Sequence, residues 1–162
     1  MTTTHTPTMH DHAMSYAKRG YHIFPVWWIN DFGTCGCGNR NCKDPGKHPI
    51  PYRGVWDATT DSTQIAAWWA KHPRANIGWH PGPSGHLAMD LDKYKDEFDA
   101  TATGAIITKA DEETLTSLTG GGGNHLGYAT PAGEKFGSNR SGLPKGIDIR
   151  CWGGYIILPP LS

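Results

Sequence analysis

The chain has 162 residues, enough for one domain with a buried core, and its fifteen basic and fifteen acidic side chains cancel at pH 7. A net charge of zero excludes a protein that is drawn to DNA or to an anionic membrane by its overall field, so any nucleic-acid contact must use local patches. No apolar run is long enough to span a bilayer, and residues 1–12 lack a signal-peptide core. We therefore expect a cytoplasmic protein with no membrane partner.

The composition predicts a folded α/β (α+β) protein with many irregular connections, because seven tryptophans accompany 21 glycines and 12 prolines. Residues 1–8 are rich in threonine and are expected to be flexible, with one domain over residues 9–162. Apolar residues at helical spacing then predict a short first helix that ends at Gly20. A buried strand is expected over 21–26.

A second helix is expected after Asp61, because Asp61 and Gln64 resemble a capping box in front of an apolar face. Pro73 forbids continuation of that helix. Residues 93–101 are predicted to form a short charged helix. The remaining strands are expected at 76–79, 86–91, 114–118, 126–129, 146–150 and 155–158.

Three of the four cysteines lie within eight residues, in a stretch over 33–52 that has almost no core-forming side chains. In a reducing compartment such clustering indicates a metal rather than disulfides. A tetrahedral zinc site would supply the missing cross-link, although three free thiols in a loop are the alternative. The predicted ligands are Cys35, Cys37, Cys42 and His48, and the competing candidates for the fourth ligand are His5, His10 and His12.

Two strand ends carry paired polar side chains. Asp90 and Asp92 stand at positions i and i+2, which puts both carboxylates on one side of a sheet, where they could share a divalent cation. Two solvated aspartates at a strand end are the alternative. Asp148 and Arg150 repeat the spacing, and they offer either an acid for a metal beside a cation for a phosphate or a simple surface ion pair.

A run of four glycines precedes a histidine and ends in Gly122-Gly123-Asn124-His125. Backbone without Cβ atoms can approach phosphates closely, and a histidine just beyond can donate to them. A flexible linker followed by an ordinary histidine is the alternative. Because four glycines cost considerable entropy to order, a turn between two strands favours the functional interpretation.

In this order the segments resemble the bifunctional primase-polymerase N-terminal domain of phage and plasmid replication proteins, within the archaeo-eukaryotic primase superfamily. The resemblance covers nearly the whole chain. It is carried by Tyr16-Ala17-Lys18-Arg19-Gly20-Tyr21-His22-Ile23-Phe24-Pro25, Gly46-Lys47-His48-Pro49, Asp57-Ala58-Thr59-Thr60-Asp61, Trp68-Trp69, Ala75-Asn76-Ile77-Gly78, Asp90-Leu91-Asp92, Gly122-Gly123-Asn124-His125, Asp148-Ile149-Arg150, Gly153-Gly154-Tyr155 and Pro159-Pro160.

The resemblance implies a primase-like core, with a central mixed sheet flanked by helices and a zinc-binding loop inserted at 33–52. It also implies that three carboxylates bind catalytic Mg²⁺ or Mn²⁺ ions, namely Asp90, Asp92 and Asp148. We expect the strands that carry these residues and His125 to lie in one sheet and to bring all four together.

For nucleotide binding, the resemblance implies that His125 is catalytic and holds the phosphates of the incoming nucleotide. Arg150 would assist, and the backbone of Gly122, Gly123 and Asn124 would line the same site. The implied partners are nucleoside triphosphates, a DNA template and a primer. A helical segment and a helicase domain are expected C-terminal to this chain.

The implied activity is template-dependent nucleotidyl transfer by a DNA polymerase and primase, in which two divalent metals serve the addition of nucleotides to a primer 3′-OH. With no overall positive field, the chain is expected to extend a primer far better than it starts one. The basic residues Arg40, Lys43 and Lys47 predict that the cysteine-rich loop sits beside the DNA.

Two functions of other classes remain open at this stage. A metal-dependent nucleotide-sugar glycosyltransferase also pairs an Asp-X-Asp with a metal and a diphosphate, but it leaves the cysteines and the glycine-histidine turn unexplained. A non-catalytic zinc DNA-binding module explains the cysteines and leaves the three aspartates without a role.

Overall fold

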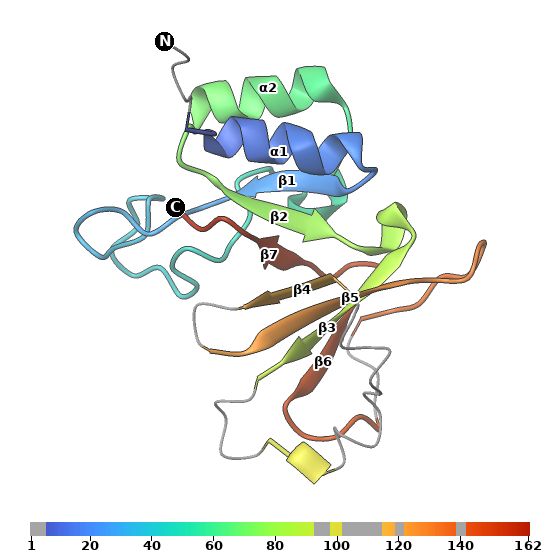
Figure 1. Cartoon of the computed structure of the whole chain (residues 1–162). Helices are drawn as coiled ribbons and strands as arrows, with labels where there is room; N and C mark the ends of the chain where they lie inside the picture. The colour runs from blue at the N-terminus through green and yellow to red at the C-terminus, as the bar shows by residue number, and fades with distance from the viewer. Residues whose placement is uncertain (1–5, 93–97, 102–114, 119–121, 139–141) are drawn as a thin grey trace. The chain divides into compact units, whose positions relative to one another are not determined.

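The computed structural model describes residues 6–92, 98–101, 115–118, 122–138 and 142–162 (Figure 1). The chain divides into two compact units, one of Met1–Trp79 with Ile157–Ser162 and one of His80–Ile156. Each unit is built around its own sheet. Among the helices in the described part of the chain, none has both the length and the apolar character that a membrane crossing requires.

The first unit packs two helices on one face of a three-stranded sheet. Its elements are α1 (Met9–Lys18), β1 (His22–Val26), the 3-10 helix η1 (Gly54–Asp57), α2 (Ser62–Lys71) and β2 (Asn76–His80), and the sheet has the order β1-β2-β7, with β7 at Ile156–Leu158. The helices α1 and α2 pack on each other and on β1, side by side above the sheet in Figure 1. The core of this unit includes the fully buried side chains of Phe24, Ile65 and Ile77.

The caps of the two helices show why they begin where they do. Thr8 accepts a hydrogen bond from the backbone N–H of Asp11, and the Asp11 carboxylate accepts one from the N–H of Thr8, which makes a complete capping box for α1. At α2, Asp61 is the N-cap as predicted, and its side chain accepts from the N–H of Thr63. Gly20, at φ 87°, follows the end of α1 in the left-handed region that favours glycine.

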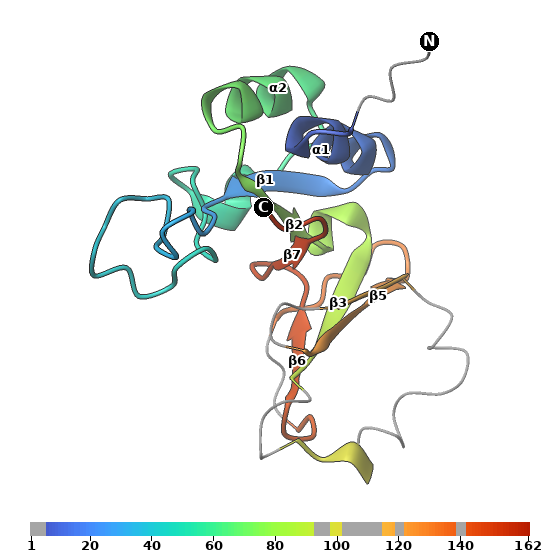
Figure 2. The same cartoon turned by 60° about the vertical axis from the view of Figure 1, so that its left-hand side comes forward.

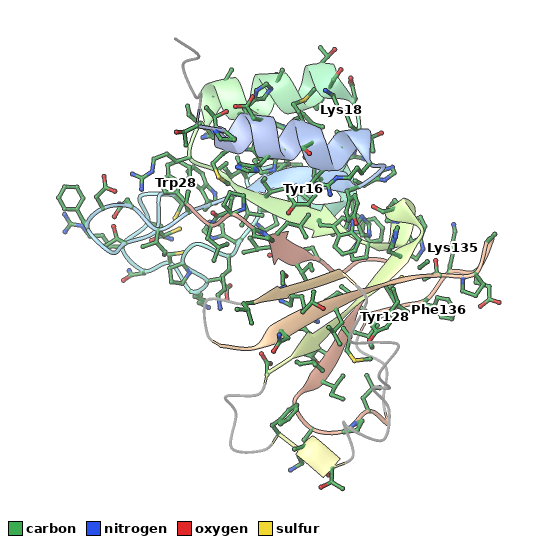
Figure 3. The ribbon with its side chains drawn as sticks, viewed as in Figure 1. Tyr16, Lys18, Trp28, Tyr128, Lys135 and Phe136 are labelled. Atoms are coloured by element: carbon green, nitrogen blue, oxygen red, sulfur yellow. The ribbon has the colours of Figure 1, made fainter. Side chains whose placement is uncertain are left out.

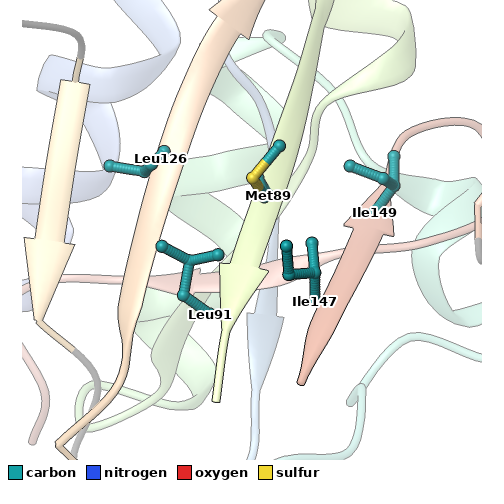
Figure 4. Packing of buried hydrophobic residues seen from close by; sticks show 5 residues of the cluster. All are labelled: Met89, Leu91, Leu126, Ile147 and Ile149. Carbon is teal, nitrogen blue, oxygen red and sulfur yellow. The ribbon is translucent and has the colours of Figure 1, made fainter. Parts of the chain in front are cut away.

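The second unit contains a four-stranded antiparallel sheet of order β4-β5-β3-β6. Its strands are β3 (His86–Leu91), β4 (Leu115–Leu118), β5 (Asn124–Ala129) and β6 (Ile147–Arg150). Figure 2 shows β3 between β5 and β6. One face carries the apolar cluster of Figure 4, formed by Met89, Leu91, Leu126, Ile147 and Ile149. Because side chains alternate along a strand, the residues between these apolar positions lie on the opposite face.

The expectation of one central mixed sheet is wrong: the described strands form two antiparallel sheets in an α+β arrangement. Alternating apolar residues identify strands but do not say which strands share a sheet. The expected strand bounds differ by at most two residues, most at β5, which begins at Asn124 rather than Leu126 because its first two residues are polar. The predicted charged helix at 93–101 falls mostly outside the described residues. Both α-helices with described bounds belong to the first unit, whereas the 3-10 helix η2 (Gly82–Ser84) lies in the second.

Candidate active site and metal centre

Asp90 lies at the centre of the polar face of the four-stranded sheet. In the strand register it stands directly opposite His125 of β5 on one side and Asp148 of β6 on the other. Directly paired residues in antiparallel strands have Cβ atoms about 4.5–5.5 Å apart and share a face. The sheet therefore brings together three of the predicted site residues that are far apart in the sequence.

The contact between Asp90 and His125 leaves polar atoms without hydrogen bonds. His125 Nε2 lies 3.4 Å from Asp90 Oδ1, with side-chain exposures of 12% and 20%. Among the residues that the structure describes, neither Asp90 Oδ1 nor His125 Nδ1 has a hydrogen-bond partner, and both atoms are buried. An unsatisfied buried polar atom costs about 1–3 kcal/mol, so two adjacent ones indicate a place where a ligand would supply the partners.

Asp92 continues the same face one residue beyond β3. Its backbone N–H donates to the carbonyl of Gly146 at 2.9 Å, which extends the β3–β6 pairing, and the residue is only 9% exposed. Gly146 has φ 84°, and a Cβ at this position would meet the ring of Phe98 at 2.7 Å. Glycine is therefore required where the chain turns into β6 beside Asp92.

Arg150 and Asp148 form the surface ion pair that the sequence left as an alternative. Arg150 Nη2 lies 3.1 Å from Asp148 Oδ2, with 25% of the arginine side chain and 43% of the aspartate side chain exposed. An ion pair this exposed contributes about 0–1 kcal/mol. The stability of the fold therefore does not depend on this pair, and exchanging the pair for contacts to a ligand would cost little.

Ser138 is a residue that the sequence analysis missed. Its Oγ donates to the carbonyl of Trp152 at 3.2 Å and accepts from the N–H of Cys151 at 3.0 Å, so it holds the backbone directly after Arg150. A Cβ on Gly154 would collide with Ser138 Oγ and would lie 3.2 Å from Arg150 Cδ. Ser138 and Gly154 together set the path of the chain around Arg150. Ser138 is separated from Arg150 in the sequence and belongs to none of the predicted motifs, so no sequence pattern indicated it.

The residues just before His125 in the glycine-histidine turn can contribute backbone rather than side chains to the polar face. Gly122 has φ 86° and open space around it, whereas Gly123 is buried. Asn124 pairs with Leu91, so strand alternation puts its side chain on the apolar face and not beside His125. A role of Asn124 at the polar face would therefore use its main chain. The two preceding glycines lie outside the described residues.

In the first unit, the four residues predicted to bind zinc do lie together. One ligand atom from each of Cys35, Cys37, Cys42 and His48 lies within 4.8 Å of all the others, and Cys42 Sγ is 3.6 Å from His48 Nδ1. Zinc distances of about 2.3 Å to sulfur and 2.1 Å to nitrogen place tetrahedral ligands roughly 3.6–3.8 Å apart. The cluster thus fits a structural zinc ion, and His48 is the fourth member. His10 lies instead on α1.

The cysteine-rich loop also has packing that the sequence did not suggest. The Trp27 N–H donates to the carbonyl of His48 at 3.0 Å, and the Gly46 N–H donates to Cys35 Sγ at 3.4 Å. Trp28, labelled in Figure 3, covers Gly36 so closely that a Cβ there would lie 2.9 Å from the indole ring. The tryptophans just before the loop therefore stabilise its conformation together with the Cys₃His cluster.

The thiols of the cluster differ in how readily they ionise. Burial opposes ionisation of Cys35, but hydrogen bonds from the N–H groups of Cys37 and Gly46 outweigh it, so the pKa of Cys35 is lowered. Burial, and then the neighbouring thiols, raise the pKa of Cys42 to about 11. Several thiolates cannot coexist here without a cation between them, which is a further reason that the donor set fits zinc.

The polar face of the second sheet gathers three carboxylates, a histidine and an arginine, and the loop of the first unit carries a Cys₃His cluster. These are the donor sets of a metal-dependent phosphoryl-transfer domain with a zinc loop. The family described as bifunctional DNA primase/polymerase, N-terminal, matches residues 13–161, and the chain belongs to this family. None of the curated proteins compared with the chain matches it. The family resemblance is confirmed, whereas an origin in a phage or plasmid stays a prediction.

Proposed function

We propose that this chain is a template-dependent nucleotidyltransferase that adds nucleotides to a primer 3′-OH, as membership of the DNA primase/polymerase family implies. The observation that supports it most is the position of Asp90, paired with His125 and Asp148 on neighbouring strands, with a buried carboxylate oxygen that receives no hydrogen bond from the described residues. This arrangement suits a ligand that is cationic or that brings its own donors.

The carboxylates fit divalent metal ions. Asp90, Asp92 and Asp148 offer only oxygen ligands, which favour Mg²⁺ or Mn²⁺, and Asp90 Oδ1 is buried with no hydrogen bond from the part of the chain that the structure describes. In polymerases, two such ions stabilise the attacking and leaving oxygens during in-line displacement at phosphorus. The role of the three aspartates is to hold the ions at a fixed place on a rigid sheet.

The cationic and hydrogen-bonding side chains would bind the triphosphate. His125 is nearly buried and touches Asp90, so it can donate to a phosphate oxygen next to the metal ligands. Arg150 is held by Asp148 with its guanidinium partly exposed, which suits a bidentate contact to phosphate. The backbone of the glycine turn before His125 could approach a phosphate closely, because Gly122 carries no side chain and has open space around it.

The zinc loop would have a structural role and would lie beside the DNA. Its basic residues Arg40, Lys43 and Lys47 are exposed, so the phosphates of a DNA strand could reach them. Replacing Lys43 and Lys47 by glutamate should weaken the binding of a primed template and leave the binding of free nucleotide intact. Equal loss of both would contradict this role.

The decisive experiment incubates the zinc-loaded protein with Mg²⁺ or Mn²⁺, deoxynucleotides and a primed template, beside parallel reactions with a uridine-diphosphate sugar or with template alone. Primer elongation supports the proposal, and its loss in Asp148→Ala, but not in Glu134→Ala, would assign it to this site. Glu134 is the matched control because it is an exposed carboxylate outside the sheet. Sugar transfer, or template binding without any synthesis, would replace the proposal by one of the two other classes.

Extension of a primer should exceed the start of a new strand. Starting requires two nucleotides and a bare template to be held at once, and each association costs several kcal/mol before contacts offset it. The chain has no net charge with which to attract the template. Efficient synthesis on unprimed single strands at the same salt concentration would contradict this expectation.

A further inference from the structure

A short turn in the first unit leaves two large aromatic side chains in solvent. Tyr52 is 102% exposed and Trp56 is 58% exposed, and Arg53, which follows Tyr52, has 69% of its side chain exposed. We call Tyr52, Arg53 and Trp56 the aromatic ledge. The three residues belong neither to the zinc cluster nor to the acidic sheet face. Exposed tryptophan and tyrosine on a soluble protein indicate a binding surface more often than scattered aliphatic residues do.

The ledge is anchored at both ends to β1. The N–H of Ile50 donates to the carbonyl of Pro25 at 3.0 Å, while Thr59 and Ile23 exchange two backbone hydrogen bonds of 3.0 Å. Between these anchors, Val55 of η1 points into the core and is only 8% exposed. The exposed rings therefore stand on a fixed piece of backbone, and binding would not have to order it.

Arg53 is held flat by the carboxylate of Asp57. Arg53 Nε donates to Asp57 Oδ1 at 2.8 Å, Nη2 lies 2.7 Å from the same oxygen, and the backbone N–H of Arg53 donates to Oδ2 at 3.1 Å. This pairing offsets the charge of the guanidinium and fixes its plane. Arg53 thus offers a flat surface for stacking more than an unpaired charge for a phosphate.

We propose that the aromatic ledge binds single-stranded DNA by stacking bases on Tyr52 and Trp56. The proposal rests on the proposed function in one respect, since that function makes a template strand the partner of this chain. A chain with no net charge must bind such a strand largely through contacts that do not depend on its overall field. Stacking on aromatic rings is of that kind, and it tolerates any sequence because every base has a π-face.

A protein partner fits the ledge less well. Tyrosine, tryptophan and arginine also anchor protein interfaces, but such interfaces bury about 1,200–2,000 Å² in total around an apolar centre. Within the described residues 49–57, Tyr52 and Trp56 are the only large apolar side chains counted as exposed. Two rings flanked by an ion pair match one or two bases better than they match a second protein surface.

The test measures binding without chemistry. Fluorescence anisotropy compares a labelled oligothymidine with a strand of the same length made of abasic sites, using zinc-loaded protein and no triphosphate or catalytic metal. Both strands carry the same phosphates, so only stacking separates them. We expect the protein to bind oligothymidine at least about tenfold more tightly. The double variant Tyr52→Ala, Trp56→Ala should bind both strands equally.

Two further variants guard against loss of fold. The pair Tyr52→Phe and Trp56→Phe keeps flat rings at both positions and should retain most of the preference for bases. Phe32→Ala is the matched control, because Phe32 is 90% exposed but lies outside the ledge, and it should bind as the unaltered protein does. Equal affinity of the unaltered protein for the two strands, or an unchanged preference in the double alanine variant, would overturn the proposal.

The outcomes also separate this inference from the proposed function. Base-dependent binding that the double alanine variant loses, in a protein that adds no nucleotides, would support the ledge and refute the polymerase assignment. Primer extension together with an unchanged strand preference in that variant would support the polymerase assignment and refute the ledge. Self-association that the double alanine variant abolishes, without any change in oligothymidine binding, would make the ledge an interface between copies and overturn the inference.

Discussion

The cysteine loop of the first unit and the acidic face of the second both gather ligands for cations, but they do so at different distances along the chain. The loop takes all four ligands from Cys35 to His48. The acidic face takes Asp90, His125 and Asp148 from three strands, and only the strand register brings them together. A local site can therefore be recognised from spacing alone, whereas a site assembled from several strands depends on the fold.

The two regions also differ in how completely their donors are satisfied. Cys35 Sγ receives a backbone N–H from Gly46 at 3.4 Å, and the four ligand atoms already lie at distances that suit a closed tetrahedral site. Asp90 Oδ1, by contrast, is buried with no hydrogen bond among the described residues. The first arrangement is typical of a structural ion and the second of a site that stays open for a reactant.

The largest effect is expected from removing a zinc ligand, since a structural zinc contributes roughly 10–16 kcal/mol of binding free energy in small zinc-binding peptides. Cys42→Ala should reduce the zinc content of the purified protein from one ion per chain to none and lower the Tm. Elemental analysis and thermal unfolding measure both. Cys151→Ser is the control, because Cys151 is a buried cysteine outside the cluster, and zinc-free protein before any substitution would contradict the site.

A large loss of activity, but not of stability, is expected at the acidic face. Asp90→Ala should slow nucleotide addition about a thousandfold or more, because metal ions in such sites contribute several kcal/mol. Its free energy of unfolding should not fall, since the substitution removes a buried oxygen that has no hydrogen-bond partner within the described residues. Primer extension, urea unfolding and zinc content measured on one preparation test this, and activity near that of the unaltered protein would refute the mechanism.

A smaller effect is expected for His125→Ala, which should raise the KM for the triphosphate about tenfold to a hundredfold while the three carboxylates still bind metal. The physical reason is that an imidazole donates to phosphate but does not hold the ions. Steady-state kinetics and Mn²⁺ titration, followed by electron paramagnetic resonance, separate the two roles. Loss of Mn²⁺ binding in this variant would instead make His125 a metal ligand.

The smallest effect is expected at Ser138, which acts through the backbone beside Arg150. Ser138→Ala removes two hydrogen bonds, each worth about 1 kcal/mol net, and should raise the KM for the triphosphate several-fold with little change in kcat. Ser138→Thr keeps the hydroxyl and should restore the KM. If the alanine variant instead lowered kcat and left KM unchanged, Ser138 would not act by positioning Arg150.

Sequence patterns predicted most elements of the fold because each depends on near neighbours. The first and second helices, the strand at β3 and the N-cap Asp61 all follow from periodicity or from a local hydrogen bond. The division into two sheets could not be predicted in this way, because the residue pattern of one strand does not identify the distant strand with which it pairs. The capping box at Thr8 was missed for a different reason, since a threonine-rich end looks flexible until a helix is known to follow it.

The candidate site divides in the same way. Spacing predicted the zinc ligands, and strand alternation put Asp90 and Asp92 on one face. The prediction that Asp90 lies beside His125 and Asp148 used both the shared strand faces and the family resemblance, and the strand register now shows these three side by side. Nothing in the sequence indicated Ser138, because its contacts are to main-chain atoms of Cys151 and Trp152.

The spacing of the two donor sets along the chain also sets the order in which they form during synthesis. All four zinc ligands leave the ribosome together, so the loop can bind its ion while β3 is still being made. At about 5–20 residues per second, Asp148 follows Asp90 by roughly 3–12 s. Asp90 lacks Asp148 throughout that interval, and for about the first 2–7 s it lacks His125 as well. A shortage of zinc would therefore act on the nascent chain before the carboxylates of the acidic face have been gathered.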